Sequence, residues 1–214
     1  MIRGILFDMD GVLADSEEFI CKAAIMMFSE SGLEVVPDDF KPFIGTGENS
    51  YLGGVAQKYG FSVDIDKVKK RTYEIYKKII KGKLKPLPGA LEFVSFCRNK
   101  GFKIALATSA DTVKMIANLN EIGIPASTFH AIITGLDVVN KKPFPDIYIK
   151  AAGELGLNPS ECLVIEDALS GIKAARSAGC RCLAVNTSFD SSSLSEANWV
   201  CNSLENVPEE ALNW

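Results

Sequence analysis

Short apolar runs that alternate with helical patterns constrain the fold of this chain more than any other feature of its sequence. Between the runs, apolar residues recur at the i, i+3, i+4 and i+7 spacing of a helix, as at Ala90, Phe93, Val94 and Cys97. Strands that alternate with helices form parallel sheets, because each return to the sheet needs a long crossover. The sequence therefore predicts an α/β fold. The strand candidates are residues 2–7, 103–108, 131–134, 162–165 and 181–185, with a short sixth candidate at 199–201.

The alternation is interrupted from residue 16 to residue 83, where helical patterns follow one another without a strand between them. Ser16 is a candidate N-cap with Glu17 and Glu18 in the first turn, and this helical pattern continues to Gly32. A later helical pattern covers residues 73–80. We therefore expect a helical unit inserted into an α/β domain. The predicted boundaries are 1–15 and 84–214 for the α/β core and 16–83 for the helical unit.

The charge balance bears on the class of partner. A net charge of -4 and a pI near 5.2 lack the basic character that binding to nucleic acid or to an anionic membrane surface requires. The sequence has no leader-like start and no apolar run of about 18 residues, and the six cysteines lack C-x-x-C spacing. We expect a cytoplasmic monomer with reduced, buried thiols, and neither a nucleic-acid nor a membrane partner.

Four of the strand candidates end in residues that bind metal or phosphate. Each group has a structural alternative when it is taken alone: a helix cap, an acidic first turn or a solvated lysine. In a parallel sheet, however, the ends of these strands meet at one edge, where α/β proteins bind ligands. Carboxylates that gather there repel one another unless a cation such as Mg²⁺ lies among them. The residues are Asp8 and Asp10, Thr108 and Ser109, Lys142, and Glu166 and Asp167.

The same segments resemble a known family. FDMDGVLADS, ALATSAD, KKPFPDIY and VIEDALSGI are similar to the four motifs of the haloacid dehalogenase superfamily, and the resemblance spans nearly the entire chain. It is nearest to the branch of phosphatases and β-phosphoglucomutase-like enzymes, in which a helical cap follows the first motif. The resemblance implies a Rossmann-like parallel core with strand order 5-4-1-2-3, and it identifies residues 16–83 as the helical cap.

The resemblance also implies roles in phosphoryl transfer. Asp8 would be the nucleophile that forms an aspartyl-phosphate, and Asp10 would act first as general acid and then as general base. Thr108, Ser109 and Lys142 would bind the transferring phosphoryl group. True dehalogenases of the superfamily lack an aspartate at the position of Asp10, so we expect cleavage at phosphorus rather than of a carbon–halogen bond.

A Mg²⁺ site follows from the same resemblance. The ion would bind Asp8, the backbone carbonyl of Asp10 and Asp167. Glu166 would be either a further ligand or a support for the others.

The expected substrate is a small phosphorylated metabolite, such as a sugar phosphate. Loop 44–48 occupies the place where relatives contact substrate, so Thr46 or Glu48 would bind it unless this loop is only a turn that starts a helix. The chain departs from β-phosphoglucomutase at Ile20, near Glu48 and at Asp111, where the mutase has cationic or ionisable residues. A second phosphate would be held weakly without them. We therefore expect a phosphatase, with a phosphomutase as the alternative.

A second alternative comes from another class of protein. Response-regulator receivers also combine acidic residues, Mg²⁺, a phosphoaspartate, a hydroxyl residue and a lysine on an α/β sheet. Their motifs follow a different order and they carry no helical cap, so a phosphoaspartate signalling module is the more remote interpretation.

Overall fold

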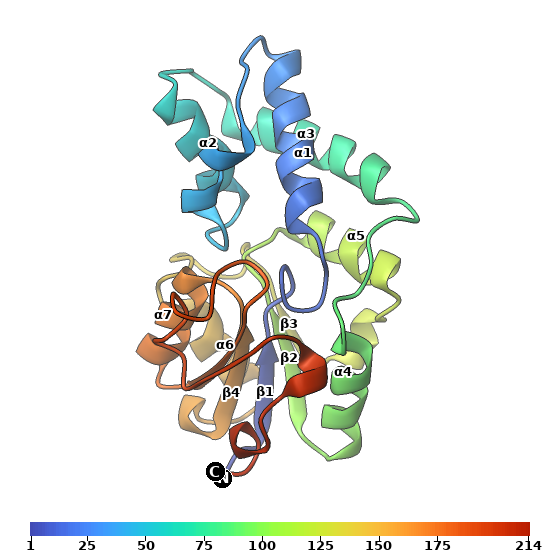
Figure 1. Ribbon diagram of the computed structural model, residues 1–214, viewed down its shortest axis with the longest axis vertical. Coiled ribbons are helices and arrows are strands. Elements are labelled where there is room, and N and C mark those ends of the chain that lie inside the picture. The colour runs from blue at the N-terminus through green and yellow to red at the C-terminus, as the bar shows by residue number, and fades with distance from the viewer.

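A six-stranded parallel sheet forms the centre of the computed structural model, which describes residues 1–214 (Figure 1). The strand order is β3-β2-β1-β4-β5-β6. The predicted order 5-4-1-2-3 is confirmed, and the sixth candidate strand extends the sheet beyond β5. The strands are β1 (Gly4–Phe7), β2 (Lys103–Ala107), β3 (Ala131–Ile133), β4 (Cys162–Glu166), β5 (Arg181–Val185) and β6 (Trp199–Cys201).

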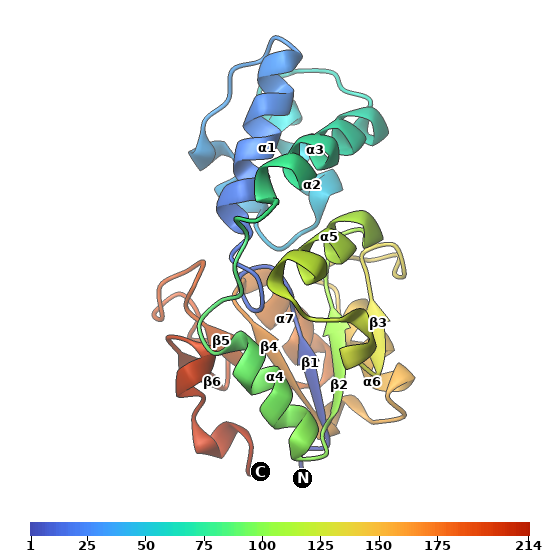
Figure 2. The ribbon, with the colours of Figure 1, turned by 90° about the vertical axis from the view of Figure 1, so that its right-hand side faces the viewer.

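Helices cover both faces of the sheet, as Figure 2 shows. One face packs against α4 (Ala90–Asn99) and α5 (Thr112–Ile122), and the other against α6 (Asp146–Glu154) and α7 (Leu169–Ala178). Side chains of a strand alternate between faces, so Ile5 and Phe7 of β1 join one apolar cluster and Leu6 joins the other. All four residues of β1 are buried, as a strand at the centre of a doubly covered sheet requires.

Three helices of the cap lie beyond the carboxyl ends of the strands (Figure 1). They are α1 (Glu17–Glu30), α2 (Glu48–Lys58) and α3 (Ile65–Ile80), and they are inserted between β1 and α4. The two crossings lie side by side: Asp15 N–H donates to Lys85 O at 3.2 Å, and Leu87 N–H donates to Leu13 O at 3.0 Å. The exact boundaries at 15/16 and 83/84 stay a prediction.

The remaining regular structure is short and lies in the connections. No helix combines the length and the apolar character needed to cross a membrane. All six cysteines are free, and five of them are buried. The 3₁₀ turns are Pro37–Asp39, Lys41–Phe43, Ala126–Thr128, Pro159–Glu161, Leu204–Asn206 and Glu209–Ala211.

Candidate active site

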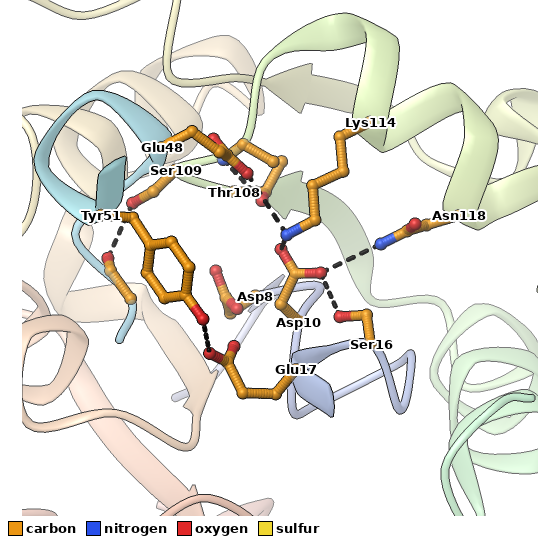
Figure 3. Close-up of polar contacts among 12 residues, drawn as sticks. Asp8, Asp10, Ser16, Glu17, Glu48, Tyr51, Thr108, Ser109, Lys114 and Asn118 are labelled. Atoms are coloured by element: carbon orange, nitrogen blue, oxygen red, sulfur yellow. Dashed lines mark hydrogen bonds and ion pairs between the residues drawn. The ribbon is translucent and has the colours of Figure 1, made fainter. Parts of the chain in front are cut away.

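A cavity lies between the carboxyl edge of the sheet and the cap. It contains roughly 470 Å³ of empty space, open mouth included. The core and the cap both contribute to its walls (Figure 3). The core supplies Asp8, Asp10, Thr108, Ser109, Ala110, Lys114 and Asp167, and the cap supplies Glu17, Ile20, Phe43, Ile44, Gly45, Gly47, Glu48 and Tyr51.

Lys142 joins the first and fourth motifs at the floor of this site. Its Nζ lies 2.5 Å from Asp8 Oδ1 and 2.6 Å from Glu166 Oε1. Glu166 Oε1 also accepts a hydrogen bond from the Tyr148 hydroxyl at 2.7 Å, and Oε2 accepts from the two backbone N–H groups that follow it. A Cβ on Gly171 would overlap this carboxylate, so the glycine of α7 leaves the space that Glu166 occupies. Glu166 therefore has donors on both oxygens and orients Lys142.

The cluster of carboxylates around Asp8 carries more negative charge than Lys142 balances. Carboxylate oxygens of Asp8, Glu166 and Asp167 lie within 4.8 Å of one another, and all three residues are buried. Burial raises the pKa of Asp8 to about 7, and burial next to Glu166 also raises the pKa of Asp167 well above its usual value. Oxygen ligands with excess negative charge fit a hard divalent cation such as Mg²⁺. Asp8 and Asp167 are the members whose oxygens are least occupied by protein donors.

Asp10 is held from two sides above this cluster. Its Oδ1 accepts hydrogen bonds from the Ser16 hydroxyl and, at 3.0 Å, from Asn118 Nδ2. Its Oδ2 lies 2.8 Å from Lys114 Nζ. Tyr76 of the cap orients Asn118, because its hydroxyl donates to Asn118 Oδ1 at 2.7 Å. Ser16 precedes α1 as predicted, but its side chain binds Asp10 instead of capping the helix.

Lys114 is a site residue that the sequence analysis missed. Asp111 is one of the positions at which the sequence differs from β-phosphoglucomutase. Its side chain pairs with Lys69 Nζ at 2.9 Å and does not line the cavity. One turn later on α5, Lys114 is only 4% exposed and also lies 3.3 Å from Glu48 Oε1. The cavity therefore keeps one ammonium on this wall. The signal in the sequence was the helical spacing of Lys114 and Asn118, which places two polar side chains on the same face of α5.

The hydroxyl residues after β2 lie where the motifs placed them. Thr108 and Ser109 line the cavity, and both are buried. Thr108 Oγ1 accepts a hydrogen bond from the Ala110 N–H at 3.1 Å. Ser109 donates to Gly45 O at 3.0 Å, so it also ties the core to the cap.

Of the two candidate substrate residues in loop 44–48, one faces the cavity. Thr46 donates to Phe43 O at 2.7 Å and is not a lining residue, whereas Glu48 lines the cavity and is the first residue of α2. The loop is thus both a turn that starts a helix and a wall of the site. Ile20 lines the cavity as well.

Glu17 and Tyr51 are two further lining residues that the sequence analysis did not place in the site. Glu17 was expected only as an acidic residue in the first turn of a helix. Burial raises its pKa to about 7, and its Oε1 accepts a hydrogen bond of 3.3 Å from the Tyr51 hydroxyl. Its position right after the crossing from the Asp10 loop is the feature that could have indicated it.

A parallel sheet that carries a carboxylate cluster and a buried lysine beneath an inserted helical cap is the arrangement of a capped α/β phosphohydrolase. Residues 5–185 match the model of the family described as haloacid dehalogenase-like hydrolase. The chain belongs to this family and is a phosphatase-type hydrolase of it.

Comparisons with individual proteins agree with this assignment. The chain is 31% identical to a phosphorylated carbohydrates phosphatase of Thermotoga maritima, over 99% of this chain and 97% of that protein. It is 47% identical to the chloroplastic protein SUPPRESSOR OF QUENCHING 1 of Arabidopsis thaliana, over 92% of this chain but 19% of that protein. It therefore spans about a fifth of this relative. The crystal structure of CbbY from Rhodobacter sphaeroides in complex with phosphate superposes with a TM-score of 0.89, 26% identity and full coverage of both chains.

Proposed function

We propose that this protein is a Mg²⁺-dependent phosphatase that hydrolyses a small phosphorylated metabolite, such as a sugar phosphate, through an aspartyl-phosphate on Asp8. The observation that carries the proposal is the position of Asp8. It lies at the floor of the cavity with one carboxylate oxygen 2.5 Å from the Lys142 ammonium, and Asp10 lines the same cavity.

In the first half of the reaction, a carboxylate oxygen of Asp8 bonds to phosphorus while the bond from phosphorus to the alcohol oxygen breaks. Asp10 donates a proton to the departing alcohol. Lys142, Thr108 and Ser109 bind the phosphoryl oxygens. A bound Mg²⁺ supplies positive charge, which lets an anionic carboxylate approach an anionic phosphate. Asp8 and Asp167 are the side chains that would hold it.

In the second half, water attacks the phosphorus of the aspartyl-phosphate and Asp10 accepts its proton. The bond between phosphorus and Asp8 breaks, which frees the carboxylate and releases phosphate. Three hydrogen-bonding partners hold the Asp10 carboxylate in place for both proton transfers.

Hydrolysis is favoured over phosphomutase activity by the charges of the cavity. A mutase must bind a second phosphate while its bisphosphate intermediate turns over. The one ammonium among the residues that line the cavity, Lys114, is already shared by Asp10 and Glu48, and Ile20 adds no charge. The phosphomutase therefore stays the alternative.

Turnover of p-nitrophenyl phosphate with and without Mg²⁺ tests the proposal. We expect Mg²⁺-dependent release of phosphate that is abolished in Asp8→Asn. Isomerisation of β-glucose 1-phosphate in the presence of glucose 1,6-bisphosphate would favour the mutase. Stable phosphorylation of Asp8 without turnover would favour the signalling module.

The cellular setting belongs to the same proposal: a monomer in the cytoplasm whose partner is a small metabolite rather than nucleic acid or membrane. One relative is described as a chloroplastic protein, so the compartment should be tested by localising the protein in the source cell. The elution volume of the purified protein in size-exclusion chromatography tests whether it is a monomer.

A further inference from the structure

The side of the catalytic cavity that would receive the alcohol part of the substrate is rich in carboxylates. We call it the leaving-group wall and define it as Glu17, Ile20, Glu48, Tyr51 and Lys114. Figure 3 shows its labelled members around the space in front of Asp8. Lys114 is the one cationic side chain among the residues that line the cavity. The wall therefore presents two carboxylates of its own and one ammonium.

The ammonium of this wall is not available to a second anion. Lys114 Nζ lies 2.8 Å from Asp10 Oδ2 and 3.3 Å from Glu48 Oε1. An anionic group that reached Lys114 would also come close to both carboxylates. Lys141 packs next to Gly47 and does not line the cavity.

The carboxylates of the wall, by contrast, have acceptor capacity left. Glu48 is 4% exposed, and its Oε2 makes no well-formed hydrogen bond, with the similarly unpaired Tyr73 hydroxyl beside it. Glu17 accepts one long bond of 3.3 Å, from the Tyr51 hydroxyl. Buried polar atoms in folded proteins are almost always paired, so an unpaired carboxylate oxygen at a binding cavity points to a donor on the ligand.

We propose that Glu48 and Glu17 determine specificity: they select phosphate monoesters whose alcohol part is uncharged and carries hydroxyl groups, and they reject a second anionic group. This inference rests on the proposed phosphatase function. Hydroxyl groups donate to the two carboxylates. A carboxylate or second phosphate at the same place is repelled, and an alkyl chain leaves the acceptors without donors.

A matched series of six-carbon phosphates tests the inference. Glucitol 6-phosphate, 6-phosphogluconate and n-hexyl phosphate share a phosphate on the terminal carbon and differ in hydroxyl groups and in charge. We expect kcat/KM for the glucitol ester to exceed that for 6-phosphogluconate by roughly a hundredfold and that for hexyl phosphate by roughly tenfold or more. Glycerol 3-phosphate, 3-phosphoglycerate and propyl phosphate form a second series for a shorter substrate.

Two variants assign the selection to the wall. Assayed at about pH 8, above the pKa of about 7 of Glu17, the variants Glu48→Gln and Glu17→Gln keep the shape of the side chain and remove its charge. Each lowers the preference for the polyol phosphate over the sugar-acid phosphate by about tenfold, through the KM of the acid. Glu18→Gln is the matched control, because Glu18 is the exposed neighbour of Glu17 on α1 and does not line the cavity. It leaves the preference unchanged.

Acetyl phosphate separates this inference from the proposed function. If Asp8 is needed for acetyl phosphate turnover but 6-phosphogluconate is hydrolysed as well as the glucitol ester, the specificity inference is overturned and the phosphatase stands. Unchanged preferences in Glu48→Gln and Glu17→Gln proteins that melt like the wild type overturn it too. A folded, Mg²⁺-loaded protein that hydrolyses neither acetyl phosphate nor any ester overturns both.

Discussion

Lys142 contacts two buried carboxylates and has almost no exposure of its own, so removing its charge leaves those buried carboxylates without their cation. We expect Lys142→Met to lower the free energy of unfolding by about 3 kcal/mol and to reduce kcat by at least about a thousandfold. Urea unfolding and phosphate release measure the two effects. Lys141→Met is the control, because the neighbouring Lys141 is only half-buried and pairs with no carboxylate. Equal losses in both variants would contradict the assignment.

Glu17 gives the protein a pH dependence of known sign. Its pKa is about 7 in the folded protein and near 4.5 in an unfolded chain, so the folded state keeps the proton to higher pH. The contribution of Glu17 to stability is therefore present below about pH 4.5 and is lost as the pH rises through about 7. We expect the free energy of unfolding to fall by up to about 3 kcal/mol more in the wild type than in Glu17→Gln over this window.

Urea unfolding in metal-free buffer at about pH 5 and about pH 8 measures this difference. Comparison with the Gln variant is needed because the pKa of Asp8 and that of Asp167 are raised too, and both carboxyls add a slope of the same sign. Glu18→Gln serves as the control on the same helix. A Glu17→Gln protein with the slope of the wild type would contradict the prediction.

At the residue scale, the sequence identified side chains that follow strands and missed those that depend on helix orientation. Asp8, Thr108 and Asp167 could be found because a strand end fixes where the next side chain lies. Lys114 could not be assigned to the site in this way. Its spacing with Asn118 shows that the two share a face of α5, but not that this face is turned toward Asp10. Glu17 belongs to the cap and lines the cavity because of the way α1 packs over the core, so its place after the Asp10 loop was the one local indication of its role.

Among the secondary-structure elements, α7 can pack against the side chain of Glu166 only because Gly171 has no side chain. A Cβ on Gly171 would overlap the carboxylate of Glu166, which holds Lys142 and accepts from Tyr148. We expect Gly171→Ala to lower kcat by at least about tenfold and the free energy of unfolding by about 2 kcal/mol. Thermal unfolding and turnover check both numbers.

Gly153 of α6 supplies the control for this substitution. It is exposed, and a Cβ there would meet nothing within 4 Å. Gly153→Ala should stabilise the protein by up to about 1 kcal/mol, because alanine loses less conformational entropy in a helix. If the two alanine variants shifted stability in the same direction, the packing of Glu166 against Gly171 would not be the reason.

At the scale of elements, most strands and helices followed from periodicity. The predicted strands at 181–185 and 199–201 have the bounds of β5 and β6, and the other four differ by one or two residues at one end. The helix α2 was not identified as an element, because Gly53 and Gly54 in its interior disfavour a helix, although Tyr51, Leu52, Val55 and Ala56 lie at helical spacing on its buried face. Gly54 is needed there, since a Cβ would overlap the ring of Phe43.

The stability of the whole molecule should depend on Mg²⁺. The folded chain brings Asp8, Glu166 and Asp167 together and the unfolded chain separates them, so an ion held by these carboxylates would bind only the folded state. At about a hundredfold excess over Kd this adds about 2.7 kcal/mol, or roughly 5–10 °C in Tm. Differential scanning fluorimetry with EDTA or Mg²⁺ measures the shift, with NaCl of equal ionic strength as the control.

Asp167→Asn should change Tm in the opposite direction when the metal is absent. Without metal, loss of one buried carboxylate should raise Tm, because repulsion among the carboxylates is relieved. With Mg²⁺, the variant should gain less than the wild type. A wild-type Tm that ignores Mg²⁺ would contradict the metal site.

The order of the strands was available from the sequence through its resemblance to a family, and the structure bears it out. The way in which the cap meets the core was not available. Contacts such as Ser109 with Gly45 and Lys69 with Asp111 join residues far apart in the chain, and they depend on how the cap packs against the core.

The chain enters and leaves the cap at neighbouring backbone positions. Asp15 is hydrogen-bonded to Lys85, and Leu87 to Leu13, through their backbones. An insertion with adjacent ends can change in length or sequence without moving the strands that bear Asp8 and Asp167. The proposed reacting group Asp8 and the proposed specificity residues Glu17 and Glu48 thus lie on opposite sides of this crossing. An enzyme of this design can keep its chemistry and change its substrate through substitutions confined to the insertion between residues 15 and 85.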